Sequence, residues 1–303
     1  MCLSVDQQRN QVKTHAKAAL DTTSDAALKA ALESWLQDGD DGDKTRAVSD
    51  ALIAALNQTA DSGADAAKVD SYTLVEDGKL TVAAELGFAP FEYMDEKTGE
   101  PVGFDVDLIA AVAQKMGLES SYLPNQKFDT LVPLIKQGGK ADVAIAGITI
   151  TDDRVKEVDF TEPYLDSNQA IVIKKDSGET EDSLNVADKK VACQSGTTGD
   201  DWISENLPAA ERVPLDDVTA ALTGVSTGLY AAMVIDLPVA SYMLTQSFSD
   251  LEVAKEIPTG EQYGIAVSKD QPALTEALNK ALADMESDGT MKDIKTKWFG
   301  SEI

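Results

Sequence analysis

Hydrophobic residues recur three or four positions apart along the first part of the chain, a spacing typical of amphipathic helices. The pattern predicts three helices, at about 5–20, 24–37 and 44–60, in a stretch that contains no proline. We therefore expect a small all-α N-terminal segment over residues 1–66 and a linker over residues 67–73.

From Thr73 onward the pattern changes to short apolar runs, which predict strands, alternating with amphipathic stretches, which predict helices. The predicted strands are 79–86, 120–126, 141–150, 190–194, 231–236 and 263–269. The predicted helices are 103–117, 128–139, 152–160, 200–207, 239–248, 272–289 and 290–300. Strands that alternate with helices favour α/β lobes with mainly parallel sheets.

Arg154 stands in an unfavourable place, the first turn of a predicted short helix that begins at Thr151. A cation near a helix N-terminus opposes the helix dipole, which costs up to about 1 kcal/mol at an exposed site. Either the neighbouring Asp152 and Asp153 compensate for this cost, or the guanidinium is held there to meet an incoming anion.

Other residues suited to ligand binding also follow predicted strands, where open α/β sheets bind their ligands. They are Glu85 and Phe88 at the end of the first strand, Gly147 and Thr149 near the end of the third, Gln194 and Thr198 around a turn that opens a helix, and Asp236 at the end of an apolar strand. Arg154 can bind a carboxylate through two parallel hydrogen bonds, and Asp236 can accept from an ammonium group. Together they suit a zwitterion, although each one alone has an ordinary explanation as an ion pair, a turn or a core residue.

The composition limits the partners and the cofactors. The chain has 53 acidic and 26 basic side chains and a net charge of -27, a field that repels nucleic acid and anionic membranes. We therefore predict no nucleic acid partner. The aspartate-rich stretch at 37–44 lacks the spacing of an EF-hand loop, and we predict no metal site and no cofactor. Cys193 lies in an apolar run, and we expect a buried thiol.

A series of motifs runs in order along residues 74–300: PFEY, GFDVDLIAAVA, FDTLVPLIKQG, AIAGITITDDR, VDFTEPY, VACQSGTTG, VIDLPVASY, YGIAVSK and DGTMKDIKTKWFG. The series resembles the extracellular solute-binding proteins, family 3, which serve polar amino acid ABC transporters. The resemblance implies a two-lobed α/β fold of the periplasmic-binding-protein type II, with two crossover strands. We expect residues 74–166 and 260–303 in lobe 1 and residues 167–259 in lobe 2.

The resemblance also implies how the backbone part of an amino acid is bound. Arg154 would bind the α-carboxylate, assisted by the backbone N–H groups of Thr149 and Thr198. The Gly147 carbonyl, the Thr149 hydroxyl and the Asp236 carboxylate would accept hydrogen bonds from the α-ammonium.

The side chain of the ligand would meet a second set of residues. Phe88 and Phe128 would sandwich it, while Glu85 and Gln194 would face its polar tip. The two aromatic rings and the acid favour arginine, lysine or glutamine, with a basic ligand ranked slightly ahead.

We therefore predict the substrate-binding component of an ABC-type amino acid importer, a monomer that closes like a hinge on a free L-amino acid and delivers it to the permease subunits. Two alternatives remain, an enzyme on the same fold with dehydratase-like chemistry, and a ligand-sensing domain. In the enzyme, Glu85 would act as a general base. Against it, the only histidine is His15, in the helical segment, and no nucleophile–histidine pair is apparent.

The location depends on the resemblance. We find no signal peptide before Cys2 and no run of 18 apolar residues, so a cytoplasmic protein and a chain that begins after a removed leader both fit. The resemblance implies an extracytoplasmic protein, in the periplasm or at the outer face of the cell membrane, with Cys2 as a candidate lipid anchor. The helical segment departs from the family, and its role stays open.

Overall fold

The computed structural model describes residues 72–95 and 97–300. The described residues belong to one compact unit, which spans residues 71–303. The three predicted N-terminal helices and the candidate lipid anchor Cys2 lie outside the described residues.

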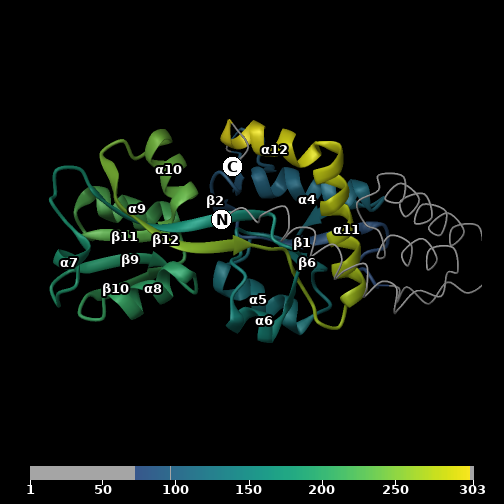
Figure 1. Cartoon of the computed structure of the whole chain (residues 1–303), viewed down its shortest axis with the longest axis horizontal. Coiled ribbons are helices and arrows are strands. Elements are labelled where there is room, and N and C mark those ends of the chain that lie inside the picture. Colours follow the sequence, from purple (N-terminus) through teal and green to yellow (C-terminus); the bar gives the residue numbers. More distant parts are fainter. Residues whose placement is uncertain (1–71, 96, 301–303) are drawn as a thin grey trace, which may run out of the picture. The chain divides into compact units, whose positions relative to one another are not determined.

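The first lobe is built on a five-stranded sheet with the order β5-β1-β6-β13-β7. Its strands are β1 (Lys79–Ala83), β5 (Glu119–Tyr122), β6 (Val143–Ala144), β7 (Asp159–Phe160) and β13 (Ala266–Val267). Its helices are α4 (Phe104–Lys115), α5 (Phe128–Gln137), α6 (Asp152–Glu157), α11 (Pro272–Asp288) and α12 (Thr290–Phe299). β1 is parallel to β5 and β6, whereas β13 is antiparallel to β6 and β7. Helices α4, α11 and α12 pack together on one face of the sheet, and α5 and α6 lie on the other (Figure 1).

The second lobe has a five-stranded sheet with the order β10-β9-β11-β8-β12. Its strands are β8 (Leu165–Lys174), β9 (Lys190–Gln194), β10 (Glu211–Leu215), β11 (Ala232–Asp236) and β12 (Leu251–Tyr263). Its helices are α7 (Glu181–Leu184), α8 (Thr198–Asn206), α9 (Val218–Thr227) and α10 (Leu237–Gln246). β9 is parallel to β10 and β11, and β8 is antiparallel to β11 and β12. Helices α9 and α10 cover one face, and α8 covers the other (Figure 1).

The long strands β8 and β12 connect the two lobes. They pair from Leu251 opposite Lys174 to Tyr263 opposite Leu165. Tyr263 also forms a bridge with Thr149 of the first lobe. The α/β fold with two lobes and two crossover strands, which the resemblance implied, is therefore confirmed, whereas the exact lobe boundaries stay predictions.

The start of α4 shows why this part of the sequence folds as it does. Leu108, Ile109 and Val112 are fully buried on one side of the helix. Gly103 precedes the helix at φ 143°, and a Cβ there would lie 2.0 Å from the Phe91 carbonyl oxygen. Only glycine fits this approach, which brings α4 against the small sheet of β2 (Gly87–Phe88), β3 (Glu92–Met94) and β4 (Pro101–Val102).

Some predicted strands are shorter than expected. The strand predicted over 141–150 reduces to the two residues of β6, because Gly147 at φ 53° turns the chain out of the sheet. The strand predicted over 263–269 reduces to β13, because Tyr263 belongs to β12. The ranges of β8, β10, β12 and α9 were not predicted from the apolar pattern. β10 is partly exposed, and α9 contains three threonines and Gly224, which favour helices weakly. Cys193 is a free, buried thiol, as predicted.

Candidate ligand-binding site

Five of the predicted site residues lie at or after the carboxyl ends of strands from the two five-stranded sheets. Glu85 follows β1, and Gly147 and Thr149 follow β6 in the first lobe. Gln194 ends β9 and Asp236 ends β11 in the second lobe. Contacts that cross from one lobe to the other bring these strand ends together, as the following residues show.

Arg154 turns toward the second lobe rather than into solvent. Its backbone N–H donates to the Thr151 side chain, which caps α6 (3.2 Å). Its Nη1 donates to the Thr149 carbonyl oxygen (2.9 Å), and its Nη2 donates to the Gly196 carbonyl oxygen of the second lobe (3.0 Å). Its Cζ lies 5.3 Å from the centroid of the Phe128 ring, a cation–π contact. The guanidinium is thus held at the junction of the lobes.

The charge of Arg154 has no bonded anion among the described residues. Burial lowers the pKa of Arg154, and the carboxyl groups of Asp236, Asp201 and Glu261 act in the opposite direction. The guanidinium stays charged, since its ordinary pKa lies far above neutrality. Its two described hydrogen bonds go to neutral carbonyl groups, and a guanidinium has five N–H donors. The arrangement therefore suits an incoming carboxylate.

Asp236 is the most strongly desolvated acid of the predicted set. It is 7% exposed, and Gln169, which lies opposite it on β8, donates a hydrogen bond to its Oδ1. Burial, and next the charge of Glu261, raise the pKa of Asp236 to about 8, while neighbouring hydrogen bonds and Arg154 offset this only in part. Asp236 therefore keeps its proton at neutral pH until a cation such as an ammonium group approaches.

Glu85 and Gln194 face each other from the two lobes. They are 7% and 3% exposed. Burial raises the pKa of Glu85 to about 7, and the Gln194 side chain offsets part of this rise. Oε2 of Glu85 and Oε1 of Gln194 have no hydrogen-bond partner within the described part of the chain. Buried polar atoms are normally paired, so these two oxygens suit a ligand group that is rich in N–H donors.

The two predicted aromatic residues contact different neighbours. Phe88 is buried and stacks on Phe91, with ring centroids 6.1 Å apart. A Cβ added to Gly147 would lie 3.1 Å from the Phe88 ring, so that ring packs on the Gly147 backbone. Phe128 lies against Arg154 instead. A sandwich of one ligand side chain by both rings stays a prediction.

Thr149 and Thr198 are joined through a residue that the sequence did not reveal, Glu261 of β12. Its Oε2 accepts hydrogen bonds from Thr149 Oγ1 (2.8 Å), Thr198 Oγ1 (2.9 Å) and Gln169 Nε2 (3.2 Å). Glu261 and Gln169 thereby enter the site from the crossover strands. Glu261 stands just before the YGIAVSK motif, but its spacing gave no sign that it would meet both threonines.

Two further buried acids support the loop after β6. Asp105 of α4 accepts hydrogen bonds from the Gly147 N–H and the Tyr164 hydroxyl, both at 2.9 Å. Burial raises the pKa of Asp105 to about 6. Burial, and next the charge of Asp105, raise the pKa of Glu92 well above its ordinary value. Asp105 thus fixes the Gly147 peptide. Asp105 and Glu92 were not among the predicted site residues, and their only signal in the sequence is that they stand in motifs that carry the resemblance.

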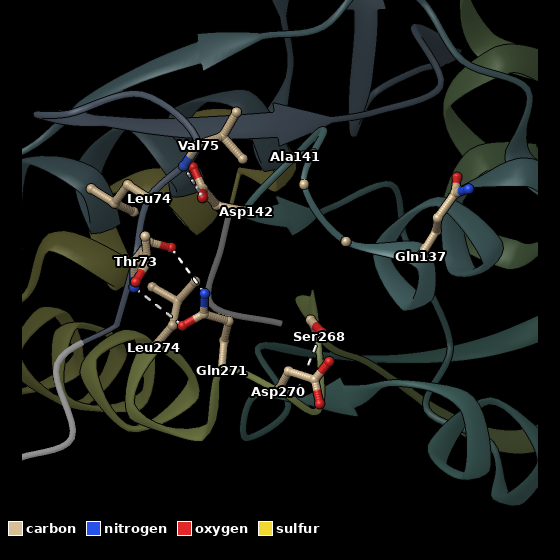
Figure 2. Close-up of a pocket in the computed structure, with 12 residues that line it drawn as sticks. Thr73, Leu74, Val75, Gln137, Ala141, Asp142, Ser268, Asp270, Gln271 and Leu274 are labelled. Carbon is tan, nitrogen blue, oxygen red and sulfur yellow. Dashed lines mark hydrogen bonds between the residues drawn. The ribbon is translucent and has the colours of Figure 1, made fainter.

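A separate pocket of about 450 Å³ lies at the other end of the first sheet (Figure 2). Asp142, just before β6, accepts hydrogen bonds there from the N–H groups of Val75 (2.8 Å) and Thr81 (2.7 Å). The Gln271 side chain exchanges two hydrogen bonds with the Thr73 backbone. Asp142 and Gln271 thus already form hydrogen bonds with the backbone of the fold, so we assign no ligand to this pocket.

The fold and the junction of strand ends define a two-lobed solute-binding protein. The chain belongs to the bacterial extracellular solute-binding proteins, family 3, whose profile matches residues 80–301. The family that the motifs predicted is therefore confirmed.

Three similar proteins illustrate the family. The ABC transporter arginine-binding protein 1 of Escherichia coli (strain K12) is 33% identical over 82% of this chain and 98% of its own length. A solved ancestral arginine-binding protein bound to arginine is 38% identical, with a TM-score of 0.68 over 74% of this chain and 99% of its own. A solved ancestral amino acid-binding protein, described as a precursor of cyclohexadienyl dehydratase, is 36% identical, with a TM-score of 0.68 over 73% of this chain and 96% of its own.

Proposed function

We propose that the chain binds one basic L-amino acid, arginine or lysine, between its two lobes by hinge closure, and delivers it to the permease subunits of an importer. The broader role, the substrate-binding component of an ABC-type amino acid importer, is confirmed by the family and by its relatives. The observation that carries the choice of ligand is the pair of buried carboxyl groups, Asp236 and Glu85, beside the guanidinium of Arg154.

Each charged group of a basic amino acid has a partner in this arrangement. Its α-carboxylate would meet the Arg154 fork, and its α-ammonium would meet Asp236. Its side-chain cation would meet Glu85, whose buried Oε2 has no hydrogen-bond partner among the described residues. A neutral side chain such as that of glutamine leaves the Glu85 carboxyl without a counter-charge. The name of the E. coli relative and the arginine-bound ancestral structure support the same choice.

A thermal-shift screen against the twenty amino acids tests the proposal. A ligand that binds only the native state raises the melting temperature, by an amount that grows with its affinity. We expect arginine and lysine to give the largest shifts and glutamine a smaller one. A shift with acidic or aliphatic amino acids alone would contradict the proposal.

Glu85→Gln should change the selectivity of the site. Hydrogen bonds to charged groups contribute about 1.5–3 kcal/mol, so we expect arginine and lysine to bind roughly 10- to 100-fold more weakly. Glutamine should bind as well as before, since it needs no charge at this position. Titration calorimetry measures the affinities for the basic ligands and for glutamine, and the exposed Glu100→Gln is the control. Equal losses for arginine and glutamine would show that Glu85 does not select a cation.

Binding of a basic ligand should release protons. The pKa of Asp236 is raised to about 8 and that of Glu85 to about 7, so both keep protons near pH 7 in the unliganded protein. The cationic groups of the ligand favour the ionised carboxylates, and on the order of one proton should leave. Calorimetry in buffers of different ionisation enthalpy measures the number of protons released per ligand bound. This number should fall toward zero near pH 9. Binding heats independent of the buffer at pH 7 would contradict this linkage.

An enzyme on the same fold is the second candidate. The raised pKa of Glu85 suits a general acid or base, and one similar structure is described as a dehydratase precursor. The named relatives are binding proteins, which supports a role without turnover. Incubation with a pool of amino acids and related metabolites separates the two, because an enzyme would deplete one compound and a binding protein would return it unchanged.

The place of action follows from the family, whose members are extracellular. Within the described residues, none of the helices has the length and apolar character needed to cross a membrane. We propose in addition that the protein acts as a monomer and that Cys2 carries a lipid anchor.

A further inference from the structure

We propose that Glu261 is a positioning residue of the amino acid site, which holds the Thr149 hydroxyl as an acceptor for the ligand's α-ammonium and ties it to Thr198 of the other lobe. This inference rests on the proposed function. It concerns a residue outside the predicted set, on a crossover strand rather than at a strand end.

The chemistry of the two groups requires a third partner. An ammonium group donates hydrogen bonds and accepts none, whereas a threonine hydroxyl carries one proton and two lone pairs. A hydroxyl that accepts from an ammonium must therefore direct its own proton elsewhere. Thr149 Oγ1 donates to Glu261 Oε2 at 2.8 Å, so its proton is already directed away and its lone pairs are available.

The same carboxylate oxygen joins the two lobes. Thr149 lies in the loop after β6 of the first lobe, and Thr198 lies in the first turn of α8 of the second. Both hydroxyls donate to Glu261 Oε2, and Gln169 Nε2 of the crossover strand β8 donates to it as well. Because the donors come from different lobes, the set is complete only when the lobes are close together. Glu261 therefore favours the closed state that the ligand stabilises.

Glu261 lies next to Asp236, the residue that would accept the ligand's α-ammonium. Gln169 Nε2 donates both to Glu261 and to Asp236, so two acids share one neutral donor. Arg154 acts on both acids only through space, and neither has a bonded cation among the described residues. A ligand ammonium beside Asp236 would supply one. The register of β12 shifts between Ile257 and Glu261, which re-aims the strand immediately before this residue.

Calorimetry with two ligands tests the role. Arginine is compared with δ-guanidinovaleric acid, which is arginine without its α-amino group, in the wild type, Glu261→Ala, Glu261→Gln and the exposed control Glu252→Ala. We expect Glu261→Ala to reduce the preference for arginine over its desamino analogue at least fivefold. Glu261→Gln retains an oxygen that can accept a hydroxyl proton, and it should recover part of the lost preference. The control should keep the wild-type preference.

Two other results would overturn the inference. An equal loss for both ligands in Glu261→Ala and Glu261→Gln would mean that the residue acts only on the fold or on closure. Wild-type affinities for both ligands in these variants would mean that Glu261 has no role in binding. A wild-type protein that binds no arginine would instead contradict the proposed function itself, so the two failures are distinct.

Discussion

Arg154→Ala should weaken amino acid binding severely while the fold stays intact. Arg154 Nη1 and Nη2 donate to carbonyl groups of both lobes, and the guanidinium is otherwise free to meet the ligand's carboxylate. Removing one partner of a buried, hydrogen-bonded charge pair costs about 2–5 kcal/mol. The dissociation constant should therefore rise roughly 30-fold to several thousand-fold, as measured by titration calorimetry with the best ligand of the thermal-shift screen.

Lys156→Ala is the matched control for this variant. Lys156 lies two residues further along α6, is exposed and pairs only with Asp153 in the described structure. Its removal deletes the same charge and should leave affinity within about twofold, since exposed ion pairs contribute little. Arg154→Lys keeps the charge but loses the planar fork, and it should bind with intermediate affinity. Unchanged affinity in Arg154→Ala would remove the main support for the proposed site.

Asp236→Asn is the substitution with the second largest expected effect. The carboxylate would accept the α-ammonium, and its loss should weaken amino acid binding at least roughly 30-fold by the same reasoning. Asp188→Asn, at an exposed position of the second lobe, is the control and should bind normally. A change of less than threefold in Asp236→Asn would place the ammonium elsewhere in the site.

The same variant should stabilise the unliganded protein at alkaline pH. Burial and the charge of Glu261 raise the pKa of Asp236 to about 8, so the folded state holds a proton that the unfolded state has lost above about pH 4. Stability must therefore fall as the pH rises through this interval. Asparagine carries no such charge, and thermal unfolding at pH 8 should show a higher melting temperature than the wild type, with the difference shrinking toward pH 4. A lower melting temperature at pH 8 would mean that the carboxylate is a structural group.

Much of the fold could be predicted because local patterns and tertiary packing agree. The apolar residues Leu108, Ile109 and Val112 lie on one side of α4, and all three are fully buried. β10 and α9 were not predicted because β10 is partly exposed and α9 contains residues that favour helices weakly. The strand over 141–150 was too long in the prediction, because an apolar run does not reveal that Gly147 leaves the sheet.

The site could be predicted only where its residues follow strands or stand in motifs. The position of Arg154 at a helix start drew attention to it, because the helix dipole opposes a cation there and an incoming anion would compensate for this cost. Glu261 and Gln169 could not be found in this way. They reach the site through the pairing of β8 with its neighbours and through the shifted register of β12, and both are properties of the folded chain.

A crystal structure of the protein grown with arginine near neutral pH tests the central claim most directly. The account predicts one arginine between the lobes, with its α-carboxylate on the Arg154 guanidinium, its α-ammonium on Asp236 and its own guanidinium beside Glu85. An arginine bound elsewhere, or bound between the lobes with its carboxylate away from Arg154, would contradict it.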